Sequence, residues 1–502
     1  MSDSSTHQPQ APREVEILIV GAGFSGLGMG IQLRRQGHES FAVIERADDV
    51  GGSWRDNTYP GVACDVPSPL YSYSFRINTE WSRMYSPGGE IWDYLRDAAR
   101  EEGIEPHLVL GADMLEAKWD AETGRWFVHT SNGDFVSEIL VSATGHLTDV
   151  KFPDVPGLDT FRGSLFHSAR WDHGTPLDGK RVGVVGTGAS ALQIIPELAE
   201  VATEVVVFQR SAPYVRPRRD RAFSESDKQL FRRDETTVRE MREVLFWGGD
   251  YNFAARRLLP SFLAEARAMA LRHLENQVPD PELRAKLTPN YEIGCKRILA
   301  SDVYYPAMTR PHVRLETSAL AAVDDTKAVS AAGSEYELDV LVFATGFETY
   351  DLPSSRRIVG RRGQNLAEHW GDNGMQAYDS VAVAGFPNLF MLNGPGTSLG
   401  HNSLIYMIET QVDHVMGALD WWRASGRPPL EVSQDSEEAF GRELDRRAAG
   451  TVLLQGGCSS WYLDPRNGRA TLSWPDFAHR FRDECATFDP AVYASTKVLA
   501  GE

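Results

Sequence analysis

The sequence predicts an α/β fold in which two Rossmann-like dinucleotide-binding domains share one chain, the second inserted in the first, with a helical excursion. Glycine-rich loops begin at Gly21 and Gly186, and each directly follows an apolar run typical of a buried parallel strand. Residues 138–145 and 338–346 are near-copies that both end in Ala-Thr-Gly. Because these strand ends bracket the second glycine-rich loop, we expect the chain to leave the first domain and later return to it.

These landmarks set the expected domain boundaries. The tail at the start of the chain is polar and contains proline, which is typical of disorder. We expect a disordered tail at residues 1–13, a first dinucleotide-binding domain at 14–150 and 340–502, and a second at 151–339 with a helical insertion at about 223–290.

The expected helical insertion has apolar residues at helical spacing. The Gly248-Gly249 pair and Pro260 should break it into pieces. Its arginine-rich, amphipathic helices could lie on a membrane surface or cover a substrate pocket, and we favour the pocket. Residues 394–403, which are rich in glycine, should line the same pocket.

Composition excludes several classes of partner. The formal charge of -19 argues against nucleic acid, because phosphate binding requires a concentrated basic surface. No apolar run approaches the roughly 20 residues of a membrane span, so we expect no stable membrane insertion and a cytoplasmic protein. The four cysteines are widely scattered. They predict no metal site and no disulfide scaffold, and fit a reducing interior.

The first glycine-rich unit has every part of a dinucleotide site. A strand at residues 14–20 leads into Gly21-Ala-Gly23-Phe-Ser-Gly26, and a helix and a second strand follow. The glycines let the backbone approach a pyrophosphate at the helix N-terminus. Glu45, at the end of the second strand, is placed to accept hydrogen bonds from a ribose diol.

A second glycine turn favours FAD in this first unit. Gly51-Gly52-Ser53-Trp54 continues through an aromatic segment to Asp65. A site for nicotinamide alone has no need of this segment, whereas the isoalloxazine of FAD must be covered beyond its pyrophosphate.

The second glycine-rich unit favours NADPH over NADH. The loop at residues 186–191 opens a predicted helix, and the strand at 204–208 is followed by Arg210 and Ser211 with no acidic residue. A carboxylate there would repel a 2′-phosphate, whereas Arg210 can bind one through two hydrogen bonds. In the alternative interpretation, Arg210 is one of several solvated arginines.

Two longer patterns indicate a family. The pattern GGxWxxxxYPGxxxD occurs at residues 51–65. The chain also has FxGxxxHxxxW(P/D), at Phe161, Gly163, His167, Trp171 and Asp172. With these patterns the chain resembles type I Baeyer–Villiger monooxygenases, the FAD- and NADPH-dependent members of the flavin monooxygenase superfamily that insert oxygen beside a ketone carbonyl. The resemblance extends from about residue 14 to 475.

The resemblance implies two sets of cofactor-binding residues. The FAD set is Gly21, Gly23, Phe24, Ser25, Gly26, Glu45, Gly52, Ser53, Trp54, Arg55, Asp56, Asp65, Tyr71, Met114 and Leu404. The NADP set is Gly186, Thr187, Gly188, Ala189, Ser190, Ala191, Leu192, Gln193, Arg210, Ser211, Lys296, Arg297 and Trp461.

The resemblance also implies a catalytic pair, Arg297 oriented by Asp65. In the family, reduced flavin and O₂ form a C4a-peroxyflavin anion that attacks a ketone to give an ester or lactone. Arg297 and bound NADP would stabilise this anion, since a guanidinium cannot lend it a proton. From the residues alone, Asp65 could instead be a turn residue and Arg297 a surface neighbour of Lys296. The implied partners are a small ketone and O₂, and the oligomeric state stays open.

Two rival functions share this architecture. One is a flavin monooxygenase that oxidises N or S atoms, and the other is an NADPH oxidase or binding protein that kept the fold. The Asp65 and Arg297 pair and the Trp171-Asp172 end of the fingerprint disfavour the first, because electrophilic transfer needs no cation. The intact cofactor positions disfavour the second.

The fingerprint at residues 161–172 lies between the two nucleotide units, where we expect a linker. Gly163 would allow it to bend, while Phe161, His167 and Trp171 would anchor two relative positions of the domains. We favour a structural or hinge role for His167 over catalysis, because linker histidines more often satisfy local backbone groups.

Overall fold

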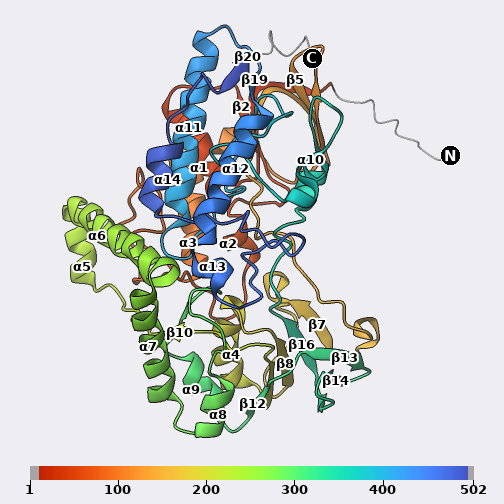
Figure 1. Ribbon diagram of the computed structural model, residues 1–502, viewed down its shortest axis with the longest axis vertical. Coiled ribbons are helices and arrows are strands. Elements are labelled where there is room, and N and C mark those ends of the chain that lie inside the picture. Colours follow the sequence, from red (N-terminus) through yellow and green to blue (C-terminus); the bar gives the residue numbers. More distant parts are fainter. Residues whose placement is uncertain (1–10, 496–502) are drawn as a thin grey trace, which may run out of the picture.

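A computed structural model describes residues 11–495, and it consists of two α/β bodies stacked along the long axis of the molecule (Figure 1). The predicted α/β class with two dinucleotide-binding domains is confirmed. Residues 1–10 of the expected tail lie outside the described residues, and Arg13 already belongs to the first strand. Among residues 11–495, no helix has the length and apolar character needed to cross a membrane.

The first body contains an eight-stranded sheet made from both ends of the chain. Its central strand β1 pairs in parallel with β2 and β6, and its last four residues are fully buried. Each such aliphatic side chain contributes roughly 1.5–3 kcal/mol through burial. The strand order is β17 (Ile358–Val359), β4 (Met114–Asp120), β5 (Arg125–Thr130), β6 (Gly133–Ser142), β1 (Arg13–Val20), β2 (Phe41–Ile44) and β3 (Leu108–Val109), with β18 (Leu389–Met391) paired to β6.

Helices from distant parts of the chain cover this sheet. Helix α1 packs against α3 and against α11, which is 21 residues long (Figure 1). The helices of this body are α1 (Phe24–Arg35), α2 (Ser53–Asp56), α3 (Gly88–Glu101), α10 (Leu366–Trp370), α11 (Leu404–Ala424), α12 (Gln434–Ala449), α13 (Val452–Gln455) and α14 (Ala478–Cys485), and a small ribbon joins β19 (Leu430–Val432) to β20 (Tyr493–Ser495).

The second body contains a five-stranded parallel sheet flanked by α4 (Ala189–Val201) and α9 (Tyr304–Met308). A small antiparallel sheet of three strands belongs to the same body: β13 (Leu320–Asp324), β14 (Lys327–Ser330) and β15 (Glu335–Glu337). The order of the parallel sheet is β12 (Val313–Glu316), β9 (Glu204–Phe208), β8 (Arg181–Val185), β16 (Val340–Phe343) and β7 (Ser164–His167). Because β16 pairs with β7 and β8, the second sheet extends past the boundary expected at residue 339.

The fingerprint at residues 161–172 is not only a linker. Its middle forms β7, the edge strand of the second sheet, in which His167 is in register with Phe343. Gly163 packs so closely that a Cβ there would lie 2.3 Å from the carbonyl oxygen of Asp339. His167 and Trp171 are buried, Phe161 is half-buried and Asp172 is exposed. The anchoring residues therefore belong to the core of one domain.

The helical excursion lies along one side of both bodies (Figure 1): its first two helices pack against the first body through Phe231 and Phe246, and its later part packs against the second. Pro260 begins α7, a position that proline favours because its missing N–H is not needed there. The expected break at Gly248-Gly249 is wrong, since both glycines lie inside α6. A Cβ on Gly249 would lie 2.9 Å from the carbonyl oxygen of His401, so close packing explains this glycine. The helices are α5 (Glu225–Arg233), α6 (Thr236–Phe253), a π-helical turn (Ala254–Leu258), α7 (Pro260–Gln277) and α8 (Pro281–Lys286).

Candidate active site between the two sheets

A cavity of about 1100 Å³ extends from the end of β1 to the end of β8. These are the carboxyl ends of parallel strands, where open α/β sheets bind ligands. Of the predicted cofactor residues, Gly26, Ala191 and Leu192 do not line it and instead pack in the protein. Those that line it are Gly21, Gly23, Phe24, Ser25, Glu45, Gly52, Ser53, Trp54, Arg55, Asp56, Asp65, Tyr71, Met114, Gly186, Thr187, Gly188, Ala189, Ser190, Gln193, Arg210, Ser211, Lys296, Arg297, Leu404 and Trp461.

The glycine loop after β1 leaves no room for side chains. Gly21 has φ +106°, and a Cβ there would lie 2.6 Å from the carbonyl oxygen of Ala143. A Cβ on Gly52 would lie 3.2 Å from the Cα of Gly23, so the two glycine turns pack directly against each other at the cavity wall. Helix α1 begins after Gly23 with no side-chain cap, which leaves its first amides available to an anion.

The second glycine loop repeats this arrangement. Gly186 has φ +114°, and a Cβ there would lie 2.5 Å from the carbonyl oxygen of Ala344. Helix α4 begins after Gly188, again without a side-chain cap. Both loops therefore fit the pyrophosphates of two dinucleotides, FAD and NADP.

The carboxylate of Glu45 is held at the end of β2. It accepts hydrogen bonds from the backbone N–H groups of Ala22 (2.9 Å) and Ala47 (3.1 Å). Arg55 Nη1 lies 3.0 Å from Glu45 Oε1, the oxygen that also accepts from Ala47. Burial acts to lower the pKa of Arg55, but attraction to Glu45 and Asp56 raises it above the ordinary value. Glu45 is thus an oriented acid beside the glycine loop, as a ribose ligand requires.

Arg297 and Asp65 meet where the two domains face each other. Arg297 donates from Nε (2.9 Å) and Nη2 (2.7 Å) to the same oxygen of Asp65. Asp65 attracts the guanidinium and raises the pKa of Arg297, although burial opposes this. Burial acts to raise the pKa of Asp65, but the charge and hydrogen bonds of Arg297 bring it below its ordinary value. Arg297 is therefore not a mere surface neighbour of Lys296.

Two cations gather at the predicted 2′-phosphate end. Lys296 Nζ donates to Ser211 Oγ (2.7 Å), and Arg210 is exposed beside it. Burial and then the charge of Arg210 lower the pKa of Lys296. The two positive charges repel each other, and a phosphate bound between them would relieve this repulsion.

Helix α4 is tied to the first domain through Gln193. The Tyr59 hydroxyl donates to Gln193 Oε1 (2.9 Å), and Gln193 Nε2 donates to the carbonyl oxygen of Ala63 (2.9 Å). These bonds cross between the domains beside the shared cavity. From this position, Gln193 helps to place the second glycine loop relative to the first.

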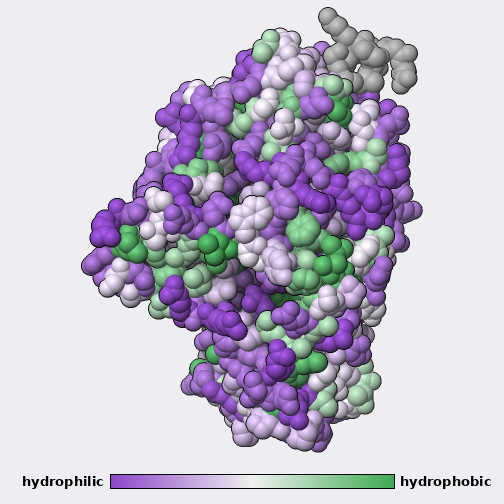
Figure 2. All heavy atoms as spheres, turned by 60° about the vertical axis from the view of Figure 1, so that its left-hand side comes forward, coloured by the Kyte–Doolittle hydropathy of each residue, from purple (hydrophilic) through white to green (hydrophobic). Residues whose placement is uncertain are grey.

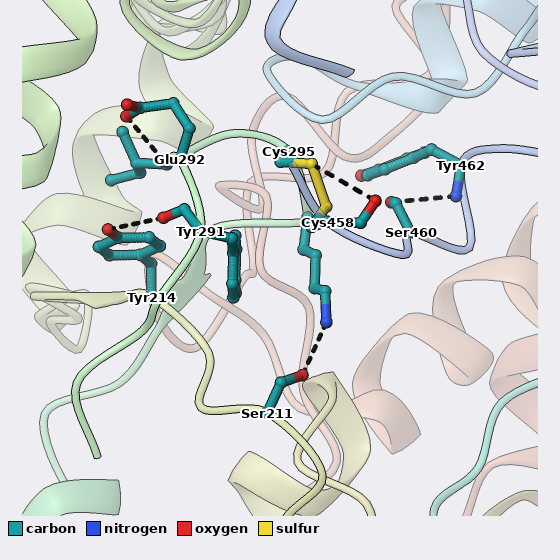
Figure 3. The surroundings of a disulfide bond; sticks show 10 residues. Ser211, Tyr214, Tyr291, Glu292, Cys295, Cys458, Ser460 and Tyr462 are labelled. Atoms are coloured by element: carbon teal, nitrogen blue, oxygen red, sulfur yellow. Dashed lines mark hydrogen bonds between the residues drawn. A yellow bond between two sulfur atoms is a disulfide. The ribbon is translucent and has the colours of Figure 1, made fainter. Parts of the chain in front are cut away.

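The scattered cysteines predict no disulfide scaffold and a reducing interior, yet Cys295 is bonded to Cys458 (Figure 3). The bond joins the segment before Lys296 to the loop that carries Trp461, which is 39% exposed and stacks on Tyr462. The pairing gave no signal in the sequence, since 163 positions separate the two cysteines. Cys64 and Cys485 are free and buried.

A second cavity of about 470 Å³ lies under the helical excursion and reaches Asp65 and Arg297. The expected pocket stretch contributes Gly400, His401 and Asn402 to its lining. Sequence reasoning missed Arg216 and Arg256, which also line it. Their only signal was the arginine content of the surrounding segments.

Comparisons with known proteins identify the family. The flavin-binding monooxygenase-like family matches residues 14–359. A Baeyer-Villiger monooxygenase of Streptomyces coelicolor is 43% identical over 486 residues, which cover 96% of this chain and 93% of that protein. Another, from Pseudomonas aeruginosa, is 40% identical over 500 residues, which cover 98% of this chain and 94% of that protein.

Solved structures give the same result. A cyclohexanone monooxygenase from Rhodococcus sp. Phi1 bound to NADP+ superposes with a TM-score of 0.84 at 28% identity, covering 95% of this chain and 97% of that one. An oxidized steroid monooxygenase bound to NADP has a TM-score of 0.83 at 31% identity, covering 94% and 96%. The chain belongs to the flavin-binding monooxygenase-like family and, within it, to the Baeyer–Villiger monooxygenases, flavoenzymes that use FAD, NADPH and O₂ to insert oxygen beside a ketone carbonyl.

Proposed function

We propose that Arg297, oriented by Asp65, is the catalytic cation in the conversion of a ketone to an ester or lactone. The observation that carries this proposal is the double hydrogen bond from Arg297 to one oxygen of Asp65, at a point that lines both cavities. Negative charge that develops on the reacting oxygen would therefore meet a fixed positive charge.

FAD and NADPH, when bound, supply the hydride and oxygen chemistry. The N-termini of α1 and α4 would hold the two pyrophosphates, and Glu45 the adenosine ribose of FAD. Lys296 and Arg210 would hold the 2′-phosphate that distinguishes NADPH from NADH. The chain's part is to bind and orient these groups.

Arg297 suits the reaction because its side chain stays charged. Attraction to Asp65 raises its pKa, so the guanidinium donates hydrogen bonds without releasing a proton. A proton donor in its place would neutralise the nucleophilic oxygen that attacks the carbonyl.

Aromatic side chains form one wall of the cavity and would exclude water. Trp54 Nε1 donates to the Tyr71 hydroxyl (3.2 Å), and the Tyr71 ring packs edge-on against Phe24. Trp461, at the opposite side, would close over the nicotinamide end. The Phe161–Asp172 fingerprint would set the relative positions of the domains through its buried strand.

The solved neighbours include a cyclohexanone and a steroid monooxygenase, so ketones of very different size are handled on this fold. The comparisons support ketone oxygenation and not the oxidation of N or S atoms.

Product analysis with linear, cyclic and aryl ketones tests this proposal. NADPH consumption should be coupled to formation of an ester or lactone that contains one atom from labelled O₂. NADPH consumption that yields only H₂O₂ with every ketone class would contradict it.

A further inference from the structure

The second cavity adjoins the proposed catalytic pair and has a mixed lining. Its volume of about 470 Å³ is suited to a small organic ligand. Figure 2 brings the side of the molecule with the helical excursion forward and shows hydrophobic groups there among hydrophilic ones. The apolar lining includes Val66, Leu70, Val244, Leu245, Phe262 and Met269.

The charges that line this cavity are not balanced. Asp65 is already paired with Arg297, and Glu265 is exposed on α7. Among the ion pairs of residues 11–495, none includes Arg216 or Arg256. The charged residues of the lining are Asp65, Arg216, Arg219, Arg256, Glu265 and Arg297.

Arg256 is held close to the proposed catalytic pair. It lies in the π-helical turn, a rare element that is frequent at functional sites. Its Nη1 donates to the carbonyl oxygen of Gly400 (2.5 Å). Gly294, with φ +89°, passes so near that a Cβ there would lie 1.8 Å from the carbonyl oxygen of Arg256. The backbone of Arg256 thus abuts the segment that leads to Arg297.

Among the described residues, neither Arg216 nor Arg256 has a carboxylate within ion-pair distance, and Asp65, which attracts both from farther away, is already paired with Arg297. Nε of Arg216 is buried with no hydrogen-bond partner. Burial, together with the charges of Arg216 and Arg297, lowers the pKa of Arg256 to about 9, which still leaves it cationic at neutral pH. A half-buried cation that is not paired with a carboxylate costs free energy. A bound anion would recover part of it.

Resting on the function proposed above, we infer that this cavity binds ketones that carry a carboxylate. Arg256 and Arg216 meet the carboxylate, the apolar lining holds the carbon chain, and the carbonyl faces Arg297. The net charge of -19 does not exclude an anion, because charges farther away than about 8 Å are largely screened at physiological salt. The nearby arginines decide the local potential.

Paired substrates test this inference in the holoenzyme. Methyl-ketone carboxylates of increasing chain length are compared with the methyl ester of each, which has the same carbonyl and no charge. At the favoured chain length, kcat/KM for the acid should exceed that for the ester by roughly tenfold or more. No preference for the acid at any length would overturn the inference.

Variants of Arg256 and Arg216 test whether these residues cause the preference for the acid over the ester. Arg256→Gln should lower the ratio of acid to ester at least severalfold, and Arg256→Lys should restore part of it because the charge remains. The matched control is Arg272→Gln, an exposed arginine of α7 outside the cavity lining, which should keep the wild-type ratio. If Arg256→Gln does not fold, Arg216→Gln provides the same test.

Two failures are distinguishable. If esters are oxygenated without any preference for acids, or if Arg256→Gln and Arg216→Gln slow both substrates equally, only the carboxylate inference is wrong. If neither acids nor esters give an oxygenated product, the proposed function fails as well. Inhibition provides a readout that does not require the acid to be turned over: an alkyl carboxylate should compete with the ketone more strongly than its amide, and equal inhibition would contradict the inference.

Discussion

Arg297 donates two hydrogen bonds to a single oxygen of Asp65, although the two residues are 232 positions apart in the chain. Asp65 follows the second glycine turn of the first domain, and Arg297 comes from the second domain, just before the short strand β11 (Leu299–Ala300), which pairs with β10 (Val215–Arg216). The same contact therefore joins the domains and places a cation where both cavities meet. The proposed catalytic cation is therefore also a contact between the two domains.

Arg297→Ala should abolish most ester formation while NADPH still reduces the flavin. Loss of one positioned donor to developing charge typically lowers kcat by about 100- to 1,000-fold. Stopped-flow absorbance measures flavin reduction, and chromatography measures the ester. Asp65→Asn should have a smaller effect, because the guanidinium remains. Oxygenation by Arg297→Ala at the wild-type rate would remove Arg297 from the mechanism.

Lys296→Ala or Arg210→Ala should raise KM for NADPH and spare NADH, because only NADPH carries the 2′-phosphate. The expected loss is about 1–3 kcal/mol for each variant. Steady-state kinetics with both coenzymes provide the measurement, and NADH serves as the internal control. Equal losses with the two coenzymes would place these residues outside the phosphate site.

Cys458→Ser should lower the unfolding midpoint and raise KM for NADPH, because the loop with Trp461 loses its covalent link to the segment before Lys296. In the chain-entropy description, a link across 163 residues contributes roughly 5 kcal/mol. Thermal unfolding and coenzyme kinetics measure the two effects. A reductant should change the wild type in the same way and leave the variant unaffected. A variant equal to the wild type in both properties would show that the link is dispensable.

The free energy of unfolding should decrease as pH falls from 6.5 towards 4, in part through His167. Burial lowers its pKa from 6.5 to about 4 in the folded protein, so the unfolded chain takes up the proton first. The stabilisation is complete above pH 6.5 and is lost towards pH 4, by as much as roughly 3 kcal/mol. Chemical unfolding at a series of pH values measures this slope.

Replacement of His167 by Gln should flatten that pH dependence. The matched control is His129→Gln, an exposed histidine of β5, which should leave the slope as in the wild type. An unchanged slope in His167→Gln would assign the acid sensitivity to other buried groups. Loss of oxygenation coupling in the same variant would support the structural role of the fingerprint.

Local pattern was sufficient to predict much of the fold. The strand expected at residues 204–208 is β9, Glu204–Phe208, and both glycine loops follow their strands as expected. A strand, a tight glycine turn and a helix are specified by residues that are neighbours in sequence. The two family patterns are local in the same sense, and they identified the cofactors and the reaction class.

Contacts between distant residues decided the rest. The Gly248-Gly249 pair signals a break by itself, yet both residues lie inside a helix, and the loop at His401 packs against Gly249. The pairing of Cys295 with Cys458 has no trace in local sequence.

Contacts between distant residues also bring Arg216 and Arg256 to the same cavity. The sequence by itself determined two dinucleotide units and the family. Only the tertiary structure decided which charges line the cavities, because packing of segments far apart in the chain sets the distance between those charges.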